Sequence, residues 1–331
     1  MISPERHWYR LSWLSIALLP AAVVFRLASA LRKMAFRYGL LRSERLDVPV
    51  VVVGNITVGG TGKTPLVIWL CAVLREQGFH PGIVSRGYGG EGEIRHVRAD
   101  ANPAAVGDEP ALLASRTGRP VWIGHDRVAA ARALLSAHPD CNVIVSDDGL
   151  QHYRLRRDFE IAVVDTSRGL GNGLPIPSGP LREPVGRLEE VDAVVFNGTG
   201  TGSADKPGSF AMLLEGTMFR NLLNPALTQD AGAFQGMRVH ALAGIGNPTR
   251  FFEHLRRLGL SFTAHPFPDH HAFAGSDVEF AGADAIIMTE KDAIKCQPFV
   301  REHHWVLPVD ARVSPGLDRL ILDKLRTAHG P

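Results

Sequence analysis

The chain has 331 residues, of which 45% are hydrophobic and 21% are charged, with a formal net charge of +2. That length accommodates two domains of ordinary size with full hydrophobic cores. A net charge near zero excludes general polyanion binding, so no nucleic-acid partner is expected. Three separated cysteines, with no Cys-x-x-Cys pair, exclude a disulfide framework and a zinc knuckle and fit a reducing cytosol.

The first predicted element is an apolar stretch from Leu11 to Phe25 with arginines on both sides. A basic start and Ala28-Ser29-Ala30 resemble a signal peptide, but Gly-Gly-Thr-Gly-Lys-Thr at 59–64 indicates a phosphate-binding loop, which export would separate from its nucleotide. The apolar run is shorter than the ~20 residues of a transmembrane span. We therefore favour a membrane-associated helix, with its arginines at anionic lipid head groups, over an ordinary buried helix.

The next pattern is a buried strand, Val50 to Val53, followed by a glycine-rich loop and a helical stretch from Leu66 to Leu74. This order is the context of a phosphate-binding loop. Glycines let backbone N–H groups turn toward a phosphate, and the helix N-terminus adds its positive dipole. We predict that Lys63 reaches the β- and γ-phosphates of a nucleotide and that Thr64 offers its hydroxyl to Mg²⁺.

One position departs from the general G-x-x-x-x-G-K-[ST] pattern, because Thr57 stands where the first glycine is usual. The alternative to a phosphate site is a plain glycine-rich turn. It is disfavoured because Gly-Lys-Thr follows a buried strand and opens a helix. The predicted nucleotide-binding residues are Thr57, Gly59, Gly60, Thr61, Gly62, Lys63 and Thr64.

Alternating strands and helices continue through the first two thirds of the chain and predict a mainly parallel, doubly wound sheet. The loop at 86–90 is interpreted as a substrate flap or an ordinary surface loop. The expected strands are 81–85, 120–123, 142–146, 159–165 and 191–196, with a helix at 126–135. A long irregular segment, 167–184, follows a strand's carboxyl end, where open α/β sheets bind ligands.

Acidic residues stand at two places where chemistry is expected. Asp147 and Asp148 end a buried strand, and such carboxylates hold Mg²⁺ or its water shell in phosphate-loop proteins. Capping of the next turn is the alternative. Asp108 stands just before a helix whose first turn contains Pro110, and helix capping alone would explain it.

The last third predicts a smaller α/β unit without a phosphate loop of its own. A linker is expected at 199–209, strands at 238–243, 285–288 and 305–309, and a helix capped by Asn247 that runs to Leu258. The segment 267–273 contains His270 in a Pro-bearing loop and is interpreted as metal ligands, an acid–base site or surface. Zinc is disfavoured because no second cluster has metal spacing. The segment 289–295 is explained by helix capping plus exposed charges.

Together these motifs resemble the tetraacyldisaccharide 4′-kinase family, the lipid A kinases of Gram-negative bacteria. The matching pieces lie in order across nearly the whole chain, and Thr57 is not a departure from this family. They are Gly-Asn-Ile-Thr-Val-Gly-Gly-Thr-Gly-Lys-Thr-Pro (54–65), Ser-Arg-Gly-Tyr-Gly (85–89), Val-Gly-Asp-Glu-Pro (106–110), Asp-Asp-Gly-Leu-Gln-His (147–152), Gly-Asn-Gly with Gly-Pro-Leu-Arg-Glu-Pro (171–184), Phe-Pro-Asp-His-His (267–271) and Thr-Glu-Lys-Asp-Ala-Ile-Lys (289–295).

The resemblance implies a P-loop NTPase-like α/β fold with a membrane-associated helix at 1–40, a kinase domain at 41–215 and a smaller α/β domain at 216–331. It implies an enzyme at the cytoplasmic face of the inner membrane, held peripherally or by its N-terminal helix. The enzyme would transfer the ATP γ-phosphate to the 4′-hydroxyl of tetraacyldisaccharide 1-phosphate, giving lipid IV-A in lipopolysaccharide synthesis. No obligate protein partner is expected.

Carried over residue by residue, the resemblance assigns Lys63 to ATP, and Thr64, Asp147 and Asp148 to Mg²⁺. It makes Asp108 the catalytic base, with His270 as its partner. The chemistry agrees, because a sugar hydroxyl is a poor nucleophile that needs a carboxylate to accept its proton. Two alternatives are a partitioning or targeting ATPase, whose signature lysine is replaced here by Val58, and a nucleotide-binding protein without catalysis.

Overall fold

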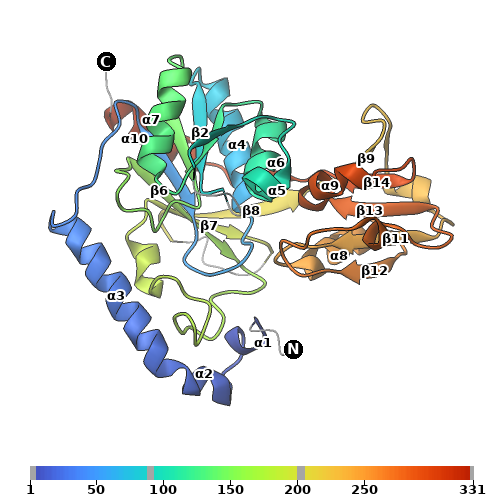
Figure 1. The fold of residues 1–331 in the computed structure, drawn as a ribbon, viewed down its shortest axis with the longest axis horizontal. Coiled ribbons are helices and arrows are strands. Elements are labelled where there is room, and N and C mark those ends of the chain that lie inside the picture. The colour runs from blue at the N-terminus through green and yellow to red at the C-terminus, as the bar shows by residue number, and fades with distance from the viewer. Residues whose placement is uncertain (1–4, 88–92, 200–205, 329–331) are drawn as a thin grey trace.

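The computed structural model describes residues 5–87, 93–199 and 206–328. The predicted loop at 86–90 and the linker at 199–209 therefore lie largely outside the described residues. Two β-sheets with helices on both faces form two lobes, and the N-terminal helices run along the outside of the first lobe (Figure 1). The predicted α/β class, with mainly parallel strands, is confirmed.

The first lobe is built on a nine-stranded sheet. Strands β8 through β4 of this sheet run parallel, and only its two edge strands are antiparallel to their neighbours. The strands, in spatial order, are β15 (Asp310–Val313), β8 (Ser209–Glu215), β7 (Ala193–Asn197), β6 (Phe159–Asp165), β1 (Val50–Gly54), β5 (Val143–Asp147), β2 (Pro81–Ser85), β4 (Val121–Ile123) and β3 (Arg95–Val97).

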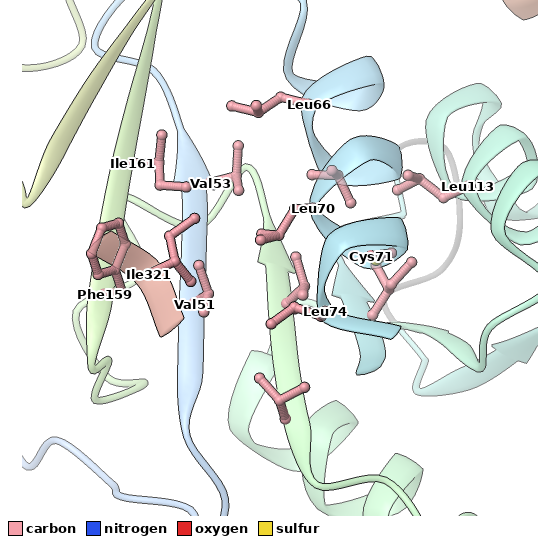
Figure 2. Close-up of a cluster of buried hydrophobic side chains, with 14 of the residues drawn as sticks. Val51, Val53, Leu66, Leu70, Cys71, Leu74, Leu113, Phe159, Ile161 and Ile321 are labelled. Carbon is pink, nitrogen blue, oxygen red and sulfur yellow. The ribbon is translucent and has the colours of Figure 1, made fainter. Parts of the chain in front are cut away.

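Apolar side chains cover both faces of this sheet, because successive residues of β1 point to opposite sides. Val51 and Val53 pack with Leu70 and Leu74 on one side (Figure 2), while Val50 and Val52 belong to the core on the other. Helices α4 (Lys63–Glu76), α6 (Asp108–Thr117) and α10 (Leu317–Ala328) contribute to the first core, and α7 (Arg127–Ala137) to the second. The short helices of this lobe are α5 (Pro103–Val106) and η1 (Val185–Glu189).

The second lobe has a six-stranded sheet with its own two cores. Helix α8 (Pro248–Arg257) packs on one face through Phe251, Phe252 and Leu255, and α9 (Glu290–Cys296) on the other. The strands, in spatial order, are β10 (Thr228–Gln229), β9 (Phe219–Asn221), β14 (His304–Leu307), β13 (Ala285–Thr289), β11 (Val239–Ala243) and β12 (Thr263–Pro266). Three 3₁₀ turns complete the lobe: η2 (Ala231–Phe234), η3 (Gly275–Val278) and η4 (Gln297–Phe299).

The apolar N-terminal stretch is divided rather than continuous. It forms α1 (Glu5–Trp8), α2 (Trp13–Ala17) and α3 (Leu19–Arg37). Pro20 stands in the first turn of α3, and a proline is tolerated there because that turn needs no N–H donor. Among the described residues, none of the helices combines the length and apolarity that crossing a bilayer requires.

The end of the chain returns to the first lobe. Strand β15 pairs with β8, and α10 packs in the first core against α4 and β6. The division at residue 215 stays a prediction, and the first sheet also takes in segments from beyond it. Other boundaries differ slightly: β7 is Ala193–Asn197, and α7 begins after its N-cap Asp126, whose carboxylate accepts bonds from two backbone N–H groups.

Candidate active site

The phosphate loop joins β1 to α4 at the carboxyl edge of the first sheet. Gly59 and Gly62 have φ of +102° and +92°, which side chains rarely tolerate. A Cβ atom at Gly62 would also come within 2.1 Å of Asn197 Nδ2, the atom that donates a hydrogen bond of 2.9 Å to the Thr61 carbonyl. Asn197 on β7 thus fixes the loop, and glycine is required at position 62 for both reasons.

Thr57 does not need to be glycine in this loop. It forms an antiparallel bridge with Leu181, and the N–H of Val58 donates to the carbonyl of Pro180 at 2.8 Å. Bridged residues are extended, which a β-branched side chain favours. Thr57 and Gly59 are not part of the cavity lining described below, whereas Gly60 to Thr64 are. Nucleotide contacts by all seven residues stay predictions.

The predicted nucleotide lysine lies beside one predicted metal ligand. Lys63 is the first residue of α4, and its Nζ is 3.4 Å from Asp148 Oδ1 and 3.4 Å from Asn55 Oδ1. Arg182 donates to both oxygens of Asp148, at 3.1 and 3.2 Å. Burial alone would raise the pKa of Asp148, but Lys63 and Arg182 hold it well below its usual range.

Asp147 has a different environment from its neighbour. It is fully buried at the end of β5, beside Val53 of β1, and Oδ2 accepts a 3.0 Å bond from the Ser85 hydroxyl. Its Oδ1 has no hydrogen-bond partner within the described part of the chain. Burial, with the charge of Glu109 adding to it, raises the pKa of Asp147 to about 7.

The two aspartates fit a magnesium ion bound together with nucleotide phosphates. Mg²⁺ uses one or two carboxylates, waters and phosphate oxygens rather than a closed protein cage. Asp147 offers a buried oxygen without a donor, which is what a cation would satisfy. The described residues contain no cluster of three or more His, Cys, Asp or Glu side chains that could hold a metal ion.

The buried charge gives a stability prediction for the metal-free protein. Because the pKa of Asp147 is higher in the folded than in the unfolded state, folding stability is lost as pH rises from about 4 to 7. We expect Asp147→Asn to remove that loss and raise the free energy of unfolding by about 2–4 kcal/mol at pH 8, with little gain at pH 4. Thermal melts in EDTA at both pH values measure this.

Asp148→Asn is the matched control, and it should act in the opposite direction. Its pKa is lowered in the fold, so ionised Asp148 stabilises above its unfolded pKa, and that stability is lost as pH falls. Asparagine tolerates the φ of +47° at this position, so backbone strain is not introduced. A lower melting temperature for both variants at pH 8 contradicts the different environments assigned to the two carboxylates.

Asp108 and His270, 162 residues apart in the chain, lie in contact across the two lobes. His270 Nδ1 is 3.2 Å from Asp108 Oδ2. Asp108 is the first residue of α6, and the N-cap position is held by Gly107, with φ +94°. The capping alternative for Asp108 is therefore wrong. The hydrogen bond with Asp108 raises the pKa of His270.

A cavity of about 1070 Å³ opens from the phosphate loop between the two lobes. Its polar walls come from the ends of β6 and β7, from α8 and from the start of α9. The lining residues that carry charge or amide groups are Lys63, Glu109, Asp165, Arg168, Asn197, Glu215, Asn247, Arg250, Glu253, His254, Arg256, Arg257, Glu290 and Lys291. The cavity has the size of a small-molecule site.

Polar contacts join the lobes around this cavity. Arg168 donates to the carbonyl of Gly246, and Arg250 donates to Asn197 Oδ1. Asn247 is the N-cap residue of α8, as the sequence predicts, although its side chain makes no cap bond. Its amide instead donates to Ser167 Oγ at 3.0 Å and to Asp165 Oδ2 at 3.3 Å. The predicted N-cap position is therefore confirmed, while the side chain of Asn247 bonds to the other lobe rather than to α8.

Sequence reasoning did not single out four of these residues. Arg182 was noted only within a motif, and Asn197, Arg168 and Arg250 received no role. A usable signal existed for Asn197, because the carboxyl ends of parallel strands meet at one edge and β7 ends there. The arginines carry no such local signal, since their partners are set by the packing of the two lobes.

Fold and site together define an α/β protein with a phosphate-binding loop at the carboxyl edge of a mainly parallel sheet. The family model described as LpxK, tetraacyldisaccharide-1-P 4′-kinase, matches residues 14–326. The chain therefore belongs to the tetraacyldisaccharide 4′-kinase family, and the resemblance seen in the sequence is confirmed.

Individual relatives agree with the family assignment. The tetraacyldisaccharide 4′-kinase of Methylobacillus flagellatus is 51% identical over 97% of this chain and 95% of its own. The tetraacyldisaccharide 4′-kinase of Azoarcus sp. is 50% identical over 100% of this chain and 98% of its own. Among solved structures, the "apo" form of LpxK from Aquifex aeolicus in complex with ATP is 27% identical, covers 94% of this chain and 99% of its own, and has a TM-score of 0.78.

Proposed function

We propose that this chain transfers the γ-phosphate of ATP to the 4′-hydroxyl of tetraacyldisaccharide 1-phosphate, giving lipid IV-A in lipid A synthesis. The observation that carries the proposal, beside family membership, is the Asp108–His270 contact formed between the lobes. A phosphate loop accounts for nucleotide binding but not for activation of an acceptor. A carboxylate paired with an imidazole supplies that second requirement.

ATP takes the cavity that opens from the phosphate loop. The loop's backbone N–H groups and the start of α4 face the phosphates, as in P-loop NTPases. The basic side chains of α8, Arg250, Arg256 and Arg257, give the same cavity positive charge. A related protein of 27% identity was crystallised in complex with ATP, which supports this placement.

Lys63 neutralises the charge that develops on the transferred phosphoryl oxygens. The Nζ atom of Lys63 contacts Asp148 and Asn55, so the ammonium group lies at the carboxyl edge of the first sheet. Thr64, Asp147 and Asp148 would hold Mg²⁺. The ion supplies further charge neutralisation for the triphosphate.

Asp108 accepts the proton of the 4′-hydroxyl as that oxygen attacks the γ-phosphorus. His270 orients the carboxylate through the bond at Oδ2 and polarises the same site. The bond that forms joins the sugar oxygen to phosphorus, and the bond that breaks joins phosphorus to the β–γ bridging oxygen, so ADP leaves. A carboxylate is suited to this task because it is ionised at neutral pH.

The N-terminal helices hold the enzyme at the cytoplasmic face of the inner membrane. Val23, Val24, Leu27 and Leu31 on α3 are 53–66% exposed, and their helical spacing places them on one apolar face. Arginines flank this face on the same helix. An acylated acceptor stays in the bilayer, since exposing each CH₂ costs about 0.8 kcal/mol, so the enzyme must approach it there.

The N-terminal segment is also attached to the first lobe near the site. Trp8 donates from Nε1 to the carbonyl of Pro177 at 3.1 Å, and the N–H of Asn172 donates to the carbonyl of Trp8 at 2.7 Å. Asn172 and Pro177 belong to the irregular segment that also carries Arg168, which contacts Gly246 in the second lobe. The irregular segment 167–184 therefore contacts both the N-terminal helices and the second lobe at the cavity.

We expect the triple variant Val24→Asp, Leu27→Asp and Leu31→Asp to lose most binding to anionic liposomes in sedimentation assays. Three charges on the exposed apolar face of α3 oppose its entry into lipid. Turnover with acceptor in vesicles should fall more than ATP binding does. A matched control places aspartate at Leu223, Leu227 and Met237, which are also exposed but lie in the second lobe. Equal loss in both triples contradicts a membrane role for α3.

Acceptor-dependent turnover tests the proposed function. Purified protein is supplied with ATP, Mg²⁺ and detergent-solubilised tetraacyldisaccharide 1-phosphate, and ADP release is followed with and without the lipid. Strong stimulation with one phosphate transferred per ADP is expected of the kinase. ADP release that is indifferent to the lipid is the behaviour of an ATPase switch and overturns the proposal.

A further inference from the structure

Helix α9 places two lysines of the Thr289–Lys295 motif at the lobe interface, where the sequence alone suggested only capping and exposed charges. The side chains of Lys291 and Lys295 are only 14% and 8% exposed. Nζ of Lys291 is 3.4 Å from Glu109 Oε1 and 3.2 Å from Asp269 Oδ1. Nζ of Lys295 is 3.9 Å from Asp108 Oδ2. The interpretation of exposed charges is therefore wrong for both lysines.

Lys295 is held in place by the second lobe. Its Nζ is 2.9 Å from Asp292 Oδ1 and 3.5 Å from the carbonyl oxygen of Gly244, and it lies 4.9 Å from the ring centroid of Phe273. Asp292 is fully buried, and its Oδ2 accepts bonds of 3.0 Å from the N–H of Gly244 and 2.6 Å from the Thr289 hydroxyl. These contacts hold the ammonium group of Lys295 in place, with Asp108 Oδ2 3.9 Å from its Nζ.

Positive charges around Asp108 offset the effect of burial on the pKa of its carboxyl group. Burial alone would raise the pKa of Asp108, but His270, Lys295 and Lys291 together hold it below its usual range. The acids nearby, Glu109, Asp269 and Asp292, are each paired with one of these lysines and offset part of their charge, yet the pKa of Asp108 is still lowered. Loss of one ammonium removes a charge that favours the carboxylate.

We propose that Lys295 is a positioning residue for phosphate transfer: anchored by Asp292, its ammonium holds the Asp108 carboxylate ionised and directed at His270. The inference rests on the proposed role of Asp108 as base. Lys291 has a different place, because it bridges Glu109 to Asp269 and lines the cavity. Lys295 is the lysine whose Nζ reaches Asp108 itself.

The test compares the pH dependence of kcat for wild type, Lys295→Met and Lys295→Arg. Removing the charge should lower kcat at pH 7 by about 10–10²-fold. The acidic limb of the kcat–pH profile reports the apparent pKa of the Asp108–His270 pair. Removing the charge should move this limb to higher pH by about one unit. The sign follows because both groups take up a proton more readily without a cation beside them. KM for ATP should stay close to wild type, and Lys295→Arg should restore the limb.

Lys324→Met is the matched control, since Lys324 pairs with Asp192 on the surface of the first lobe and should leave the profile unchanged. If Lys295→Met does not fold, Lys295→Gln retains a donor for Asp292 and Gly244 while removing the charge, and is read in the same way. A lower kcat with an unmoved limb means that Lys295 only supports the fold, which overturns the inference.

Variants in the Asp108→Asn background separate this inference from the proposed function. If Asp108→Asn alone keeps wild-type kcat, the base assignment fails, whatever Lys295 does. If Asp108→Asn is strongly impaired, adding Lys295→Met should cost little more, because its target carboxylate is gone. A full further loss in the double variant overturns the action of Lys295 through Asp108 while leaving the base in place.

Discussion

Lys63→Ala is expected to lower kcat by at least about 10³-fold while leaving the protein folded. The lysine begins α4, is only 8% exposed, and lies 3.4 Å from Asp148 at the edge where the phosphates are placed. Alanine removes the charge that offsets the developing negative charge of the transferred group. The fold should persist because Asp148 keeps its bonds from Arg182.

The measurement is lipid phosphorylation at saturating ATP, with folding checked by circular dichroism and thermal melts. Lys324→Ala, on the surface of α10, is the control for loss of a lysine as such. Turnover within a few-fold of wild type in folded Lys63→Ala protein would remove the phosphate-loop assignment. Lost activity together with a collapsed melting transition would instead make Lys63 a structural residue.

The second large effect concerns the Asp108–His270 pair. We expect Asp108→Ala and His270→Ala each to lower kcat by about 10²–10⁴-fold, the range of general acid–base catalysis. KM for ATP should change little, since neither residue is assigned to the nucleotide. The double variant should be scarcely worse than the poorer single one, because residues that act as a unit are not additive.

A double-mutant cycle on kcat measures this coupling. His271→Ala serves as the control, because it removes a neighbouring imidazole that is paired with Asp277 at 3.0 Å rather than with Asp108. Its loss should be much smaller. Losses that multiply in the double variant would assign independent roles to the two residues. A wild-type kcat in Asp108→Ala would show that the Asp108–His270 contact has no catalytic role.

Local pattern was enough to predict six strands of the first sheet and the phosphate loop. Val50 to Val53 form a continuous buried run, and Gly62 opens a helix, so the signals lie within a dozen residues. The acids at the end of β5 were found for the same reason, and the structure brings Asp148 to Lys63. Strands β3, β8 and β15 of this sheet were not predicted, and neither were β9 and β10, whose two or three residues carry too little alternation.

Contacts between distant segments did not follow from local pattern. The pairing of Asp108 with His270 came from the family resemblance, since each residue alone had an ordinary explanation. Asn247 is the N-cap residue of α8, as predicted, but only the packing of the lobes places its amide on Asp165 and Ser167. The return of β15 to the edge of the first sheet likewise depends on how the two lobes meet.

The central claim is transfer to one particular hydroxyl, and labelled phosphate tests it most directly. Protein is incubated with γ-labelled ATP and either tetraacyldisaccharide 1-phosphate or the same lipid blocked at its 4′-oxygen, and the lipid products are separated and located by mass spectrometry. The account predicts one labelled phosphate at the 4′-position of the free acceptor and none on the blocked one. Equal labelling of both lipids, or label released only as inorganic phosphate, would contradict it.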